Sequence, residues 1–169
     1  ELWRSDGTES GTYMVKDIYP GDISGMFEMT YFYDIYKGHA VLNNYLYFSA
    51  QDSQGKGIFK TDGTEAGTVK AIPSLANEYE DSTPIIINAT SDKIFYVTTV
   101  VSEAGSPPPQ NTLWSSSGTT ESSVQLLYSP INVSNKFSQN VVFNNELYFA
   151  VEMPTSSGQS LYKSDGTVE

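Results

Sequence analysis

The chain opens with Glu1-Leu2-Trp3-Arg4-Ser5-Asp6-Gly7-Thr8, and it returns to this pattern three more times along its 169 residues. The shared unit is an aliphatic residue, an aromatic residue, two variable residues and Asp-Gly-Thr. The further copies are Ile58-Phe59-Lys60-Thr61-Asp62-Gly63-Thr64, the degenerate Leu113-Trp114-Ser115-Ser116-Ser117-Gly118-Thr119 and Leu161-Tyr162-Lys163-Ser164-Asp165-Gly166-Thr167. Copies recur at intervals of roughly 50 residues, a period typical of propellers and repeat arrays.

A second motif lies between successive copies of the first. It consists of a short apolar run, a polar turn and an aromatic-rich strand, as in Val41-Leu42-Asn43-Asn44-Tyr45-Leu46-Tyr47-Phe48. Asn residues tolerate the positive φ that a two-residue hairpin turn requires. We therefore expect hairpin turns at Asn43-Asn44, Ser91-Asp92 and Asn144-Asn145.

Together the two motifs predict four short antiparallel strands in every unit. Residues 39–72 and 84–128 form complete units, 1–18 the end of a unit and 140–169 an incomplete one, which gives sheets of two, four, four and three strands. Loops are expected at 51–56, 102–111 and 153–159. This repetition favours an all-β fold, a β-propeller of four-stranded antiparallel blades. Because a closed ring needs at least four blades, we expect a partial ring of about three periods, and hence a piece of a longer protein.

Charge and composition narrow the classes of partner. The chain has 20 acidic and 9 basic residues, for a formal net charge of −11, whereas nucleic acids and anionic membrane surfaces select basic patches. Neither is therefore expected as a partner, and no apolar run is long enough to insert into a membrane. The sequence has no Cys and one His, so a zinc site is not expected.

The quoted residues resemble a known repeat. The segment 1–8, followed by Gly11-Thr12 and Val15-Lys16-Asp17-Ile18, is similar to the ELWxxDGT repeat, and the strands at 43–48 and 144–149 are similar to its other half. The resemblance covers essentially the whole chain. The third copy departs from the pattern, because Ser117 stands in place of Asp and Ser122-Ser123 in place of Gly-Thr.

The ELWxxDGT family consists of large secreted or surface proteins, mainly of bacteria and commonly of Bacteroidetes that secrete adhesins through the type IX system. Its members are named adhesins, gliding-associated proteins or hyalin-like proteins, usually without a demonstrated ligand. The resemblance implies an extracellular or cell-surface location, at the exterior of the bacterial outer membrane. It also implies a non-catalytic role in adhesion or surface assembly, with a protein or glycan as partner. A carbohydrate-active enzyme and a docking subunit of an outer-membrane complex are the alternatives.

The Asp-Gly-Thr residues are the first candidates for a site. An Asp before Gly caps a turn by accepting N–H bonds, Gly adopts positive φ and Thr bonds back locally, so we interpret these residues as structural turns. Calcium binding is the alternative, because carboxylate oxygens suit that ion, but no catalytic residue and no resident cofactor is predicted. The turn residues are Asp6, Gly7, Thr8, Asp62, Gly63, Thr64, Gly118, Thr119, Asp165, Gly166 and Thr167.

Other polar candidates have a structural interpretation beside a functional one. The acidic cluster at 78–81 is interpreted as a solvated loop, since a glycosidase needs two carboxylates that converge on one cleft. His39 is interpreted as a hydrogen-bonded residue at the start of a strand. Short glycosylation patterns mark Ser82, Asn88 and Asn132 as candidate acceptors.

The repeat aromatics Trp3, Phe59, Trp114 and Tyr162 admit two interpretations. Because every unit must bury the same apolar contact with its neighbour, we expect these aromatic side chains to pack in the core. A ring of side chains that stack on sugars is the alternative. Segment 19–37, rich in aromatic residues, is expected to connect two blades, with an exposed binding platform as the alternative. Segment 102–111 contains three consecutive Pro residues and is expected to be a rigid exposed loop. These two segments are the predicted places of recognition.

Overall fold

The computed structural model describes residues 1–26, 38–74, 83–100, 110–129, 139–152 and 159–168. All regular structure in these ranges is β-strand, which confirms the predicted all-β class, and they contain no helix that could cross a membrane. The strands are β1 (Leu2–Arg4), β2 (Tyr13–Lys16), β3 (His39–Leu42), β4 (Tyr45–Asp52), β5 (Gly55–Thr61), β6 (Val69–Pro73), β7 (Ile85–Ala89), β8 (Ile94–Val100), β9 (Gln110–Ser116), β10 (Val124–Ser129), β11 (Asn140–Phe143), β12 (Glu146–Glu152) and β13 (Gln159–Ser164).

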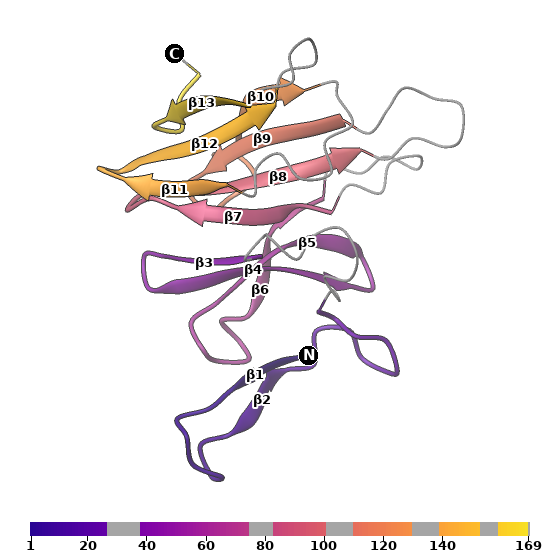
Figure 1. Cartoon of the computed structure of the whole chain (residues 1–169). Coiled ribbons are helices and arrows are strands. Elements are labelled where there is room, and N and C mark those ends of the chain that lie inside the picture. Colours follow the sequence, from indigo (N-terminus) through magenta and orange to yellow (C-terminus); the bar gives the residue numbers. More distant parts are fainter. Residues whose placement is uncertain (27–37, 75–82, 101–109, 130–138, 153–158, 169) are drawn as a thin grey trace.

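The strands form four antiparallel sheets in chain order, with two, four, four and three strands as the repeat predicted. We call them the first sheet (β1–β2), the second sheet (β3–β6), the third sheet (β7–β10) and the fourth sheet (β11–β13). Figure 1 shows them following one another from one end of the molecule to the other. In the last three sheets, the first strand of one sheet contacts the first strand of the next: β3 contacts β7, and β7 contacts β11. The described sheets do not close a ring.

The Asn-Asn pairs form the hairpin turns that the sequence predicted. Asn43 and Asn44 have φ values of 52° and 64°, and Asn144 and Asn145 have values of 49° and 62°. These left-handed residues give the turn a twist that matches the right-handed twist of the flanking strands. Two adjacent Asn residues in the second and fourth sheets therefore fix the register of the first two strands.

Two predicted connections are wrong. The third sheet has no two-residue hairpin at Ser91-Asp92, because β7 and β8 are joined by the longer turn 90–93. Residues 51–56 are not a loop, because β4 continues to Asp52 and β5 begins at Gly55. Asp52 shortens the turn: its Oδ1 accepts bonds from Gln54 N at 2.8 Å and from Lys70 Nζ at 2.6 Å. Of the other two predicted loops, Gln110, Asn111 and Gln159 belong to strands and the rest lies outside the described residues.

A bulge recurs where the last strand of a sheet pairs with the strand before it. The register shifts between Leu2 and Trp3 in the first sheet, between Ile58 and Phe59 in the second, and between Gln125 and Leu127 in the third. The extra residue increases the local twist of the outer strand. Because it recurs in all three sheets that contain this pairing, the bulge is part of the repeat.

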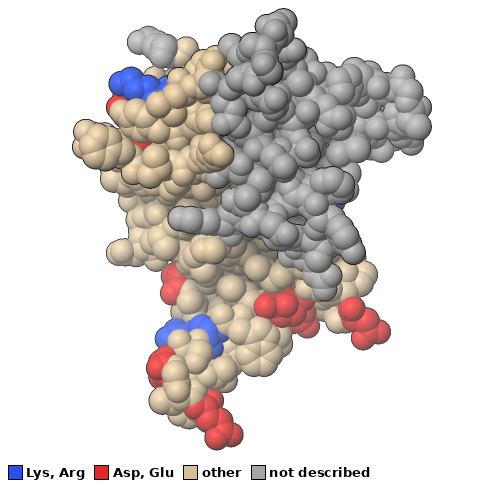
Figure 2. Space-filling view, in the orientation of Figure 1, with Lys and Arg blue, Asp and Glu red and all other residues tan. Residues whose placement is uncertain are grey.

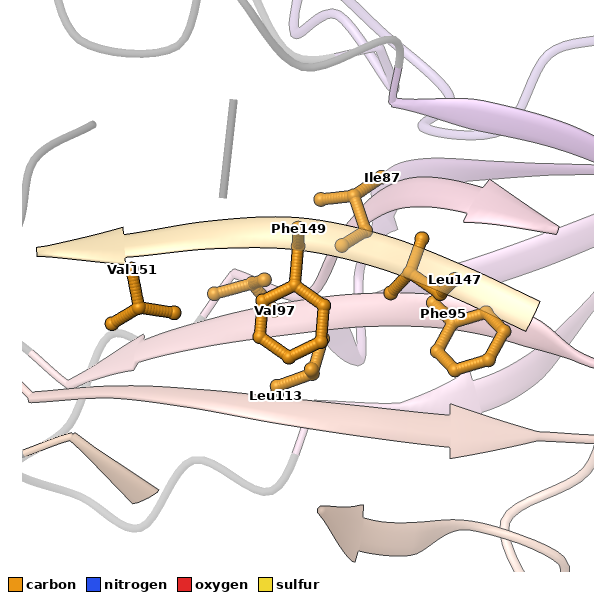
Figure 3. Packing of buried hydrophobic residues seen from close by; sticks show 7 residues of the cluster. All are labelled: Ile87, Phe95, Val97, Leu113, Leu147, Phe149 and Val151. Carbon is orange, nitrogen blue, oxygen red and sulfur yellow. The ribbon is translucent and has the colours of Figure 1, made fainter. Parts of the chain in front are cut away.

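Successive sheets pack face to face, and we call each contact a seam. In the third seam, Leu147, Phe149 and Val151 of β12 point onto Phe95, Val97 and Leu113 of β8 and β9 (Figure 3). The buried residues are Ile18, Phe48, Ala50 and Phe59 in the first seam; Leu42, Tyr47, Ile58, Ile72, Ile86, Ile94 and Tyr96 in the second; and Ile87, Phe95, Val97, Leu113, Leu147, Phe149 and Val151 in the third.

The aliphatic–aromatic pair of the repeat serves two seams at once. Neighbouring residues of a strand point to opposite faces of the sheet. In β5, Ile58 is buried in the second seam, while Phe59, which is 3% exposed, is buried in the first. In β9, Leu113 is buried in the third seam, while Trp114 packs against the second. In the second and third sheets, the pair thereby ties its sheet to both neighbouring sheets.

We expect Leu113→Ala to lower the free energy of unfolding by about 2–5 kcal/mol, because it opens a cavity at a fully buried position. The matched control is Leu161→Ala, at the same repeat position in β13. Its side chain is 76% exposed, so the expected loss is within about 0.5 kcal/mol. Urea unfolding followed by tryptophan fluorescence measures both, and equal losses would contradict the assignment of the seams.

Candidate functional site

The Asp-Gly-Thr residues form one hydrogen-bonded turn that recurs with nearly constant distances. In the second sheet, Asp62 Oδ1 accepts bonds from Thr64 N at 2.9 Å and from Thr64 Oγ1 at 2.7 Å. Gly63, with φ of 90°, donates its N–H to Thr61 Oγ1 at 2.9 Å. The turns at Asp6 and Asp165 repeat the two bonds to Thr at the same distances. The Oδ1 atom of each of these Asp residues is therefore engaged within its own turn.

The second Gly of the motif makes room for the Asp side chain. A Cβ atom placed on Gly67 would meet the carboxylate of Asp62, and one on Gly11 would meet that of Asp6. Gly67 N also donates to Thr64 Oγ1 at 2.9 Å, which holds the far end of the turn. The Asp side chain therefore packs in the space that the Gly five residues later leaves free.

The third copy keeps the turn with different chemistry. Ser117 replaces the Asp, and Ser122 replaces the Gly that follows five residues later. Ser122 Oγ lies within 3.3 Å of Thr119 N and 3.2 Å of Thr119 Oγ1, so the hydroxyl accepts the bonds that the carboxylate accepts elsewhere. Because residue 117 is not Asp in this copy, no carboxylate occupies the space beside residue 122, and Ser122 can carry a Cβ atom there.

Hydrogen bonding lowers the pKa of the turn carboxylates. For Asp62 the largest cause is the bond from the Thr64 hydroxyl, followed by the bond from the Thr64 N–H. The pKa values of Asp6 and Asp165 are lowered by the corresponding Thr8 and Thr167 groups. A carboxyl group with a lowered pKa is ionised at neutral pH and is a poor general acid. Among the described residues, no three His, Cys, Asp or Glu side chains lie together as a metal site.

The turns of the second, third and fourth sheets each also receive a side chain from the preceding sheet. Lys16 Nζ donates to Thr68 O at 2.7 Å, Lys93 Nζ to Asp165 O at 2.9 Å and Ser115 Oγ to Gly166 O at 2.7 Å. In the third sheet, the hydroxyl of Tyr47 lies against Gly118, where a Cβ atom would collide with it. Sequence reasoning missed these contacts, since the donors differ from one sheet to the next.

The repeat aromatics do not share one environment. Phe59 is core, as predicted, and it stacks on Phe48 with ring centroids 6.0 Å apart. Trp114 is half-buried, stacks on Tyr96 at 6.2 Å and donates Nε1–H to Thr98 Oγ1 at 2.9 Å. For Trp3 the prediction is wrong, because its side chain is 61% exposed. Across the first sheet Trp3 pairs with Met14 of β2, whereas Phe59 has the ring of Phe48 beside it in its sheet.

Tyr162 borders a groove of about 340 Å³ between β10 and the fourth sheet. Leu126, Leu127 and Phe149 line the groove, and Lys163 and Asp165 lie at it as well. In the second sheet, β6 covers the corresponding ring, with Lys70 Nζ 5.5 Å from the Phe59 centroid. Among the described residues no strand of the fourth sheet follows β13, so the Tyr162 ring lacks the cover that β6 gives to Phe59.

The remaining candidates lie apart from the turns. His39 begins β3 and is exposed. Asn88 is a poor glycan acceptor, since it is half-buried in β7 and donates Nδ2–H to Asn140 Oδ1 at 2.9 Å. Of segment 19–37 only residues 19–26 are described, and Met26 forms a bridge with Ala50 of β4. Ser82, Asn132, the cluster at 78–81 and the proline residues of 102–111 lie outside the described residues.

Glu1 has a role that the motif alone did not indicate. Its Oε2 accepts a bond from Ile18 N at 2.6 Å and its Oε1 accepts one from Gly25 N at 2.7 Å. The carboxylate thereby fixes the segment that leaves β2. The other copies have Gly57, Thr112 and Ser160 at this position, so this contact distinguishes the first copy.

Comparison of the chain with models of protein families, with curated proteins and with solved structures found no match. The turns, the seams and the groove therefore carry the functional argument.

Gly67→Ser is expected to lower the free energy of unfolding by about 1–3 kcal/mol, because the new Cβ atom collides with the Asp62 carboxylate. The double variant Asp62→Ser/Gly67→Ser reproduces the pair found in the third copy. It should be less destabilised than the sum of the two single variants, a favourable coupling that a double-mutant cycle of urea unfolding measures. Additive effects would sink the idea that the two residues form one unit.

Stability in acid should depend on the turn carboxylates. Because their pKa values are lower in the folded chain, they stabilise the fold above the unfolded value near 4, and this stabilisation is lost as the pH falls through the folded values. Asp6→Asn/Asp62→Asn keeps an oxygen acceptor but does not titrate. Its melting temperature should fall less than that of the unmodified chain between about pH 5 and pH 3. Thermal melts with Asp22→Asn as control test this, and parallel curves would refute it.

Proposed function

We propose that the chain is a non-catalytic scaffold, part of a β-propeller of four-stranded blades, in a secreted or cell-surface protein. The contacts between the leading strands β3, β7 and β11 support the ring, because the first strands of propeller blades gather around the axis. The second and third sheets are two blades, the first sheet is the end of a blade, and the fourth sheet is an incomplete one. The resemblance of the repeat to ELWxxDGT proteins supports the extracellular location.

The observation that carries a non-catalytic role is the use of the motif's polar groups within the turns. Asp6, Asp62 and Asp165 each accept two bonds from their own Thr residue. No buried side-chain nitrogen or oxygen atom of the described residues lacks a hydrogen-bond partner. Polar groups that are hydrogen-bonded within a turn stabilise the scaffold, so recognition of a partner is left to other surface residues.

The distribution of charge favours a protein or glycan as the partner. On the face shown in Figure 2, acidic side chains gather toward the end of the molecule that contains the first sheet. Uncharged side chains cover most of the described surface beyond that end. With a net charge of −11, the chain repels polyanions, whereas a neutral glycan or a protein surface meets no such barrier.

Adhesion without turnover is the expected result of a paired binding and activity experiment. Fluorescent beads coated with the chain are applied to a printed oligosaccharide array and to films of surface proteins, with beads carrying the denatured chain as control. In parallel, the chain is incubated with a panel of 4-nitrophenyl glycosides. We expect specific retention of the beads and no release of 4-nitrophenolate.

The variant Asp6→Asn/Asp62→Asn/Asp165→Asn separates the proposal from the enzyme alternative. Asn keeps the turn acceptor, so the variant should bind like the unmodified chain. Turnover of a glycoside that disappears in this variant would replace the scaffold by a carbohydrate-active enzyme. Equal retention of native and denatured beads on every surface would remove adhesion as the function.

A further inference from the structure

The Asp-Gly bonds of the repeat are chemically reactive points of the chain. In an unconstrained Asp-Gly sequence the Gly nitrogen attacks the side-chain carboxyl carbon of Asp, because Gly has no Cβ atom to hinder the approach. The nitrogen loses its proton, one carboxyl oxygen leaves as water, and a succinimide ring forms. Addition of one water molecule opens the ring either to Asp or to isoaspartate, in which the main chain runs through the former side chain. Asp6, Asp62 and Asp165 each precede Gly and are exposed, so burial does not protect them.

The turn engages the nitrogen that carries out the attack. Gly63 N donates its hydrogen to Thr61 Oγ1 at 2.9 Å. Thr61 is buried, and its hydroxyl lies 2.7 Å from that of Thr68, which holds it in place. The corresponding bonds of the other two turns, each 3.0 Å long, join Gly7 N to Ser5 Oγ and Gly166 N to Ser164 Oγ. In all three turns the hydrogen that the reaction must remove is therefore held in a hydrogen bond.

The turn also holds the carboxyl group that is attacked. Asp62 Oδ1 accepts bonds from Thr64 N at 2.9 Å and from Thr64 Oγ1 at 2.7 Å. Ring closure moves the carboxyl carbon onto the nitrogen of Gly63, so Oδ1 must move away from both donors. The bond from the Thr64 hydroxyl is also the largest cause of the lowered pKa of Asp62, and an ionised carboxylate is a poorer electrophile than the neutral acid. Gly67 N donates to Thr64 Oγ1 at 2.9 Å and thereby fixes the hydroxyl itself.

We infer that the Asp-Gly-Thr turn preserves the Asp-Gly bonds of this chain from rearrangement to isoaspartate, with the Thr hydroxyl as the positioning group. The consequence of a failure reaches the core, because isoaspartate adds a main-chain carbon to the turn between β5 and β6. These two strands contribute Ile58 and Ile72 to the second seam. The inference goes beyond the proposed function, since it concerns the chemical durability of the chain and not its partner.

Labelling with heavy oxygen measures the reaction at each site. The full chain is kept at neutral pH in ¹⁸O-labelled water and then digested in ordinary water, and mass spectrometry locates the label. Every passage through the succinimide introduces one labelled oxygen, whether Asp or isoaspartate results. Ser117 replaces Asp in the third copy, so the peptide that contains Ser117 is a blank within the same molecule. We expect labelling of Asp62 to be at least about tenfold slower in the folded chain than in guanidinium chloride, because unfolding removes the bonds to both reacting groups.

Thr64→Val and Thr8→Val are reciprocal variants. Each nearly keeps the size of the side chain and removes one hydroxyl, which binds Asp62 in the second sheet and Asp6 in the first. Thr64→Val should speed the labelling of Asp62 by about three- to tenfold, the factor expected for one lost hydrogen bond, and leave that of Asp6 unchanged. Thr8→Val should do the reverse. Thr64→Ser restores the hydroxyl, so it should label Asp62 at the original rate.

The reciprocal design separates local protection from overall stability. A variant that only unfolds more often speeds labelling at Asp6 and Asp62 alike, and that result overturns the proposal. Equal labelling rates in the folded and the unfolded chain overturn it as well, and so does a Thr64→Val variant that labels Asp62 no faster. Bead adhesion is measured separately, so the proposed function can fail while this protection stands.

Discussion

The alternation of side chains along a β-strand is the constraint on which the structure depends. Two adjacent apolar residues in one strand cannot enter the same seam, because they point to opposite faces. In β5 and β9 the aliphatic residue is therefore buried on the side of the following sheet and the aromatic residue on the side of the preceding one. The two residues of the pair therefore favour packing on both faces of a sheet. The aliphatic residue contacts the sheet that follows in the chain, and the aromatic residue contacts the sheet that precedes it.

The turn that follows this pair is a second unit, closed by hydrogen bonds among its own residues. The carboxylate of Asp62 and the missing Cβ of Gly67 occupy the same space, so a change of either residue alters what the other position tolerates. The third copy shows the consequence, because Ser117 and Ser122 replace both residues and the hydroxyl of Ser122 closes the turn. The polar motif is therefore variable in chemistry and constant in geometry.

Sequence reasoning predicted the features that the repeat encodes locally. The sheets, the Asn-Asn hairpins and the position of the aliphatic–aromatic pair follow from strand periodicity and from residues that tolerate positive φ. Sequence reasoning failed where the burial of a side chain or the form of a turn depends on residues from another strand or sheet. Trp3 and Phe59 occupy the same repeat position, yet only Phe59 is covered by a preceding sheet. At the short turn after Asp52 the carboxylate binds Lys70 of β6, and the bulges lie where two strands pair, so both involve a residue from another strand.

A repeat of this kind has a physical consequence that single domains avoid. The second and third sheets each pack on both faces, against the sheet before and the sheet after, so neither contains a feature that ends the stack. Leu161 differs from Leu113 in exposure and not in character, so the face of the fourth sheet that contains Leu161 is apolar although the described residues leave it uncovered. Apolar surface of this kind gains free energy by being buried, whether a ring closes, a cap covers it or another copy docks.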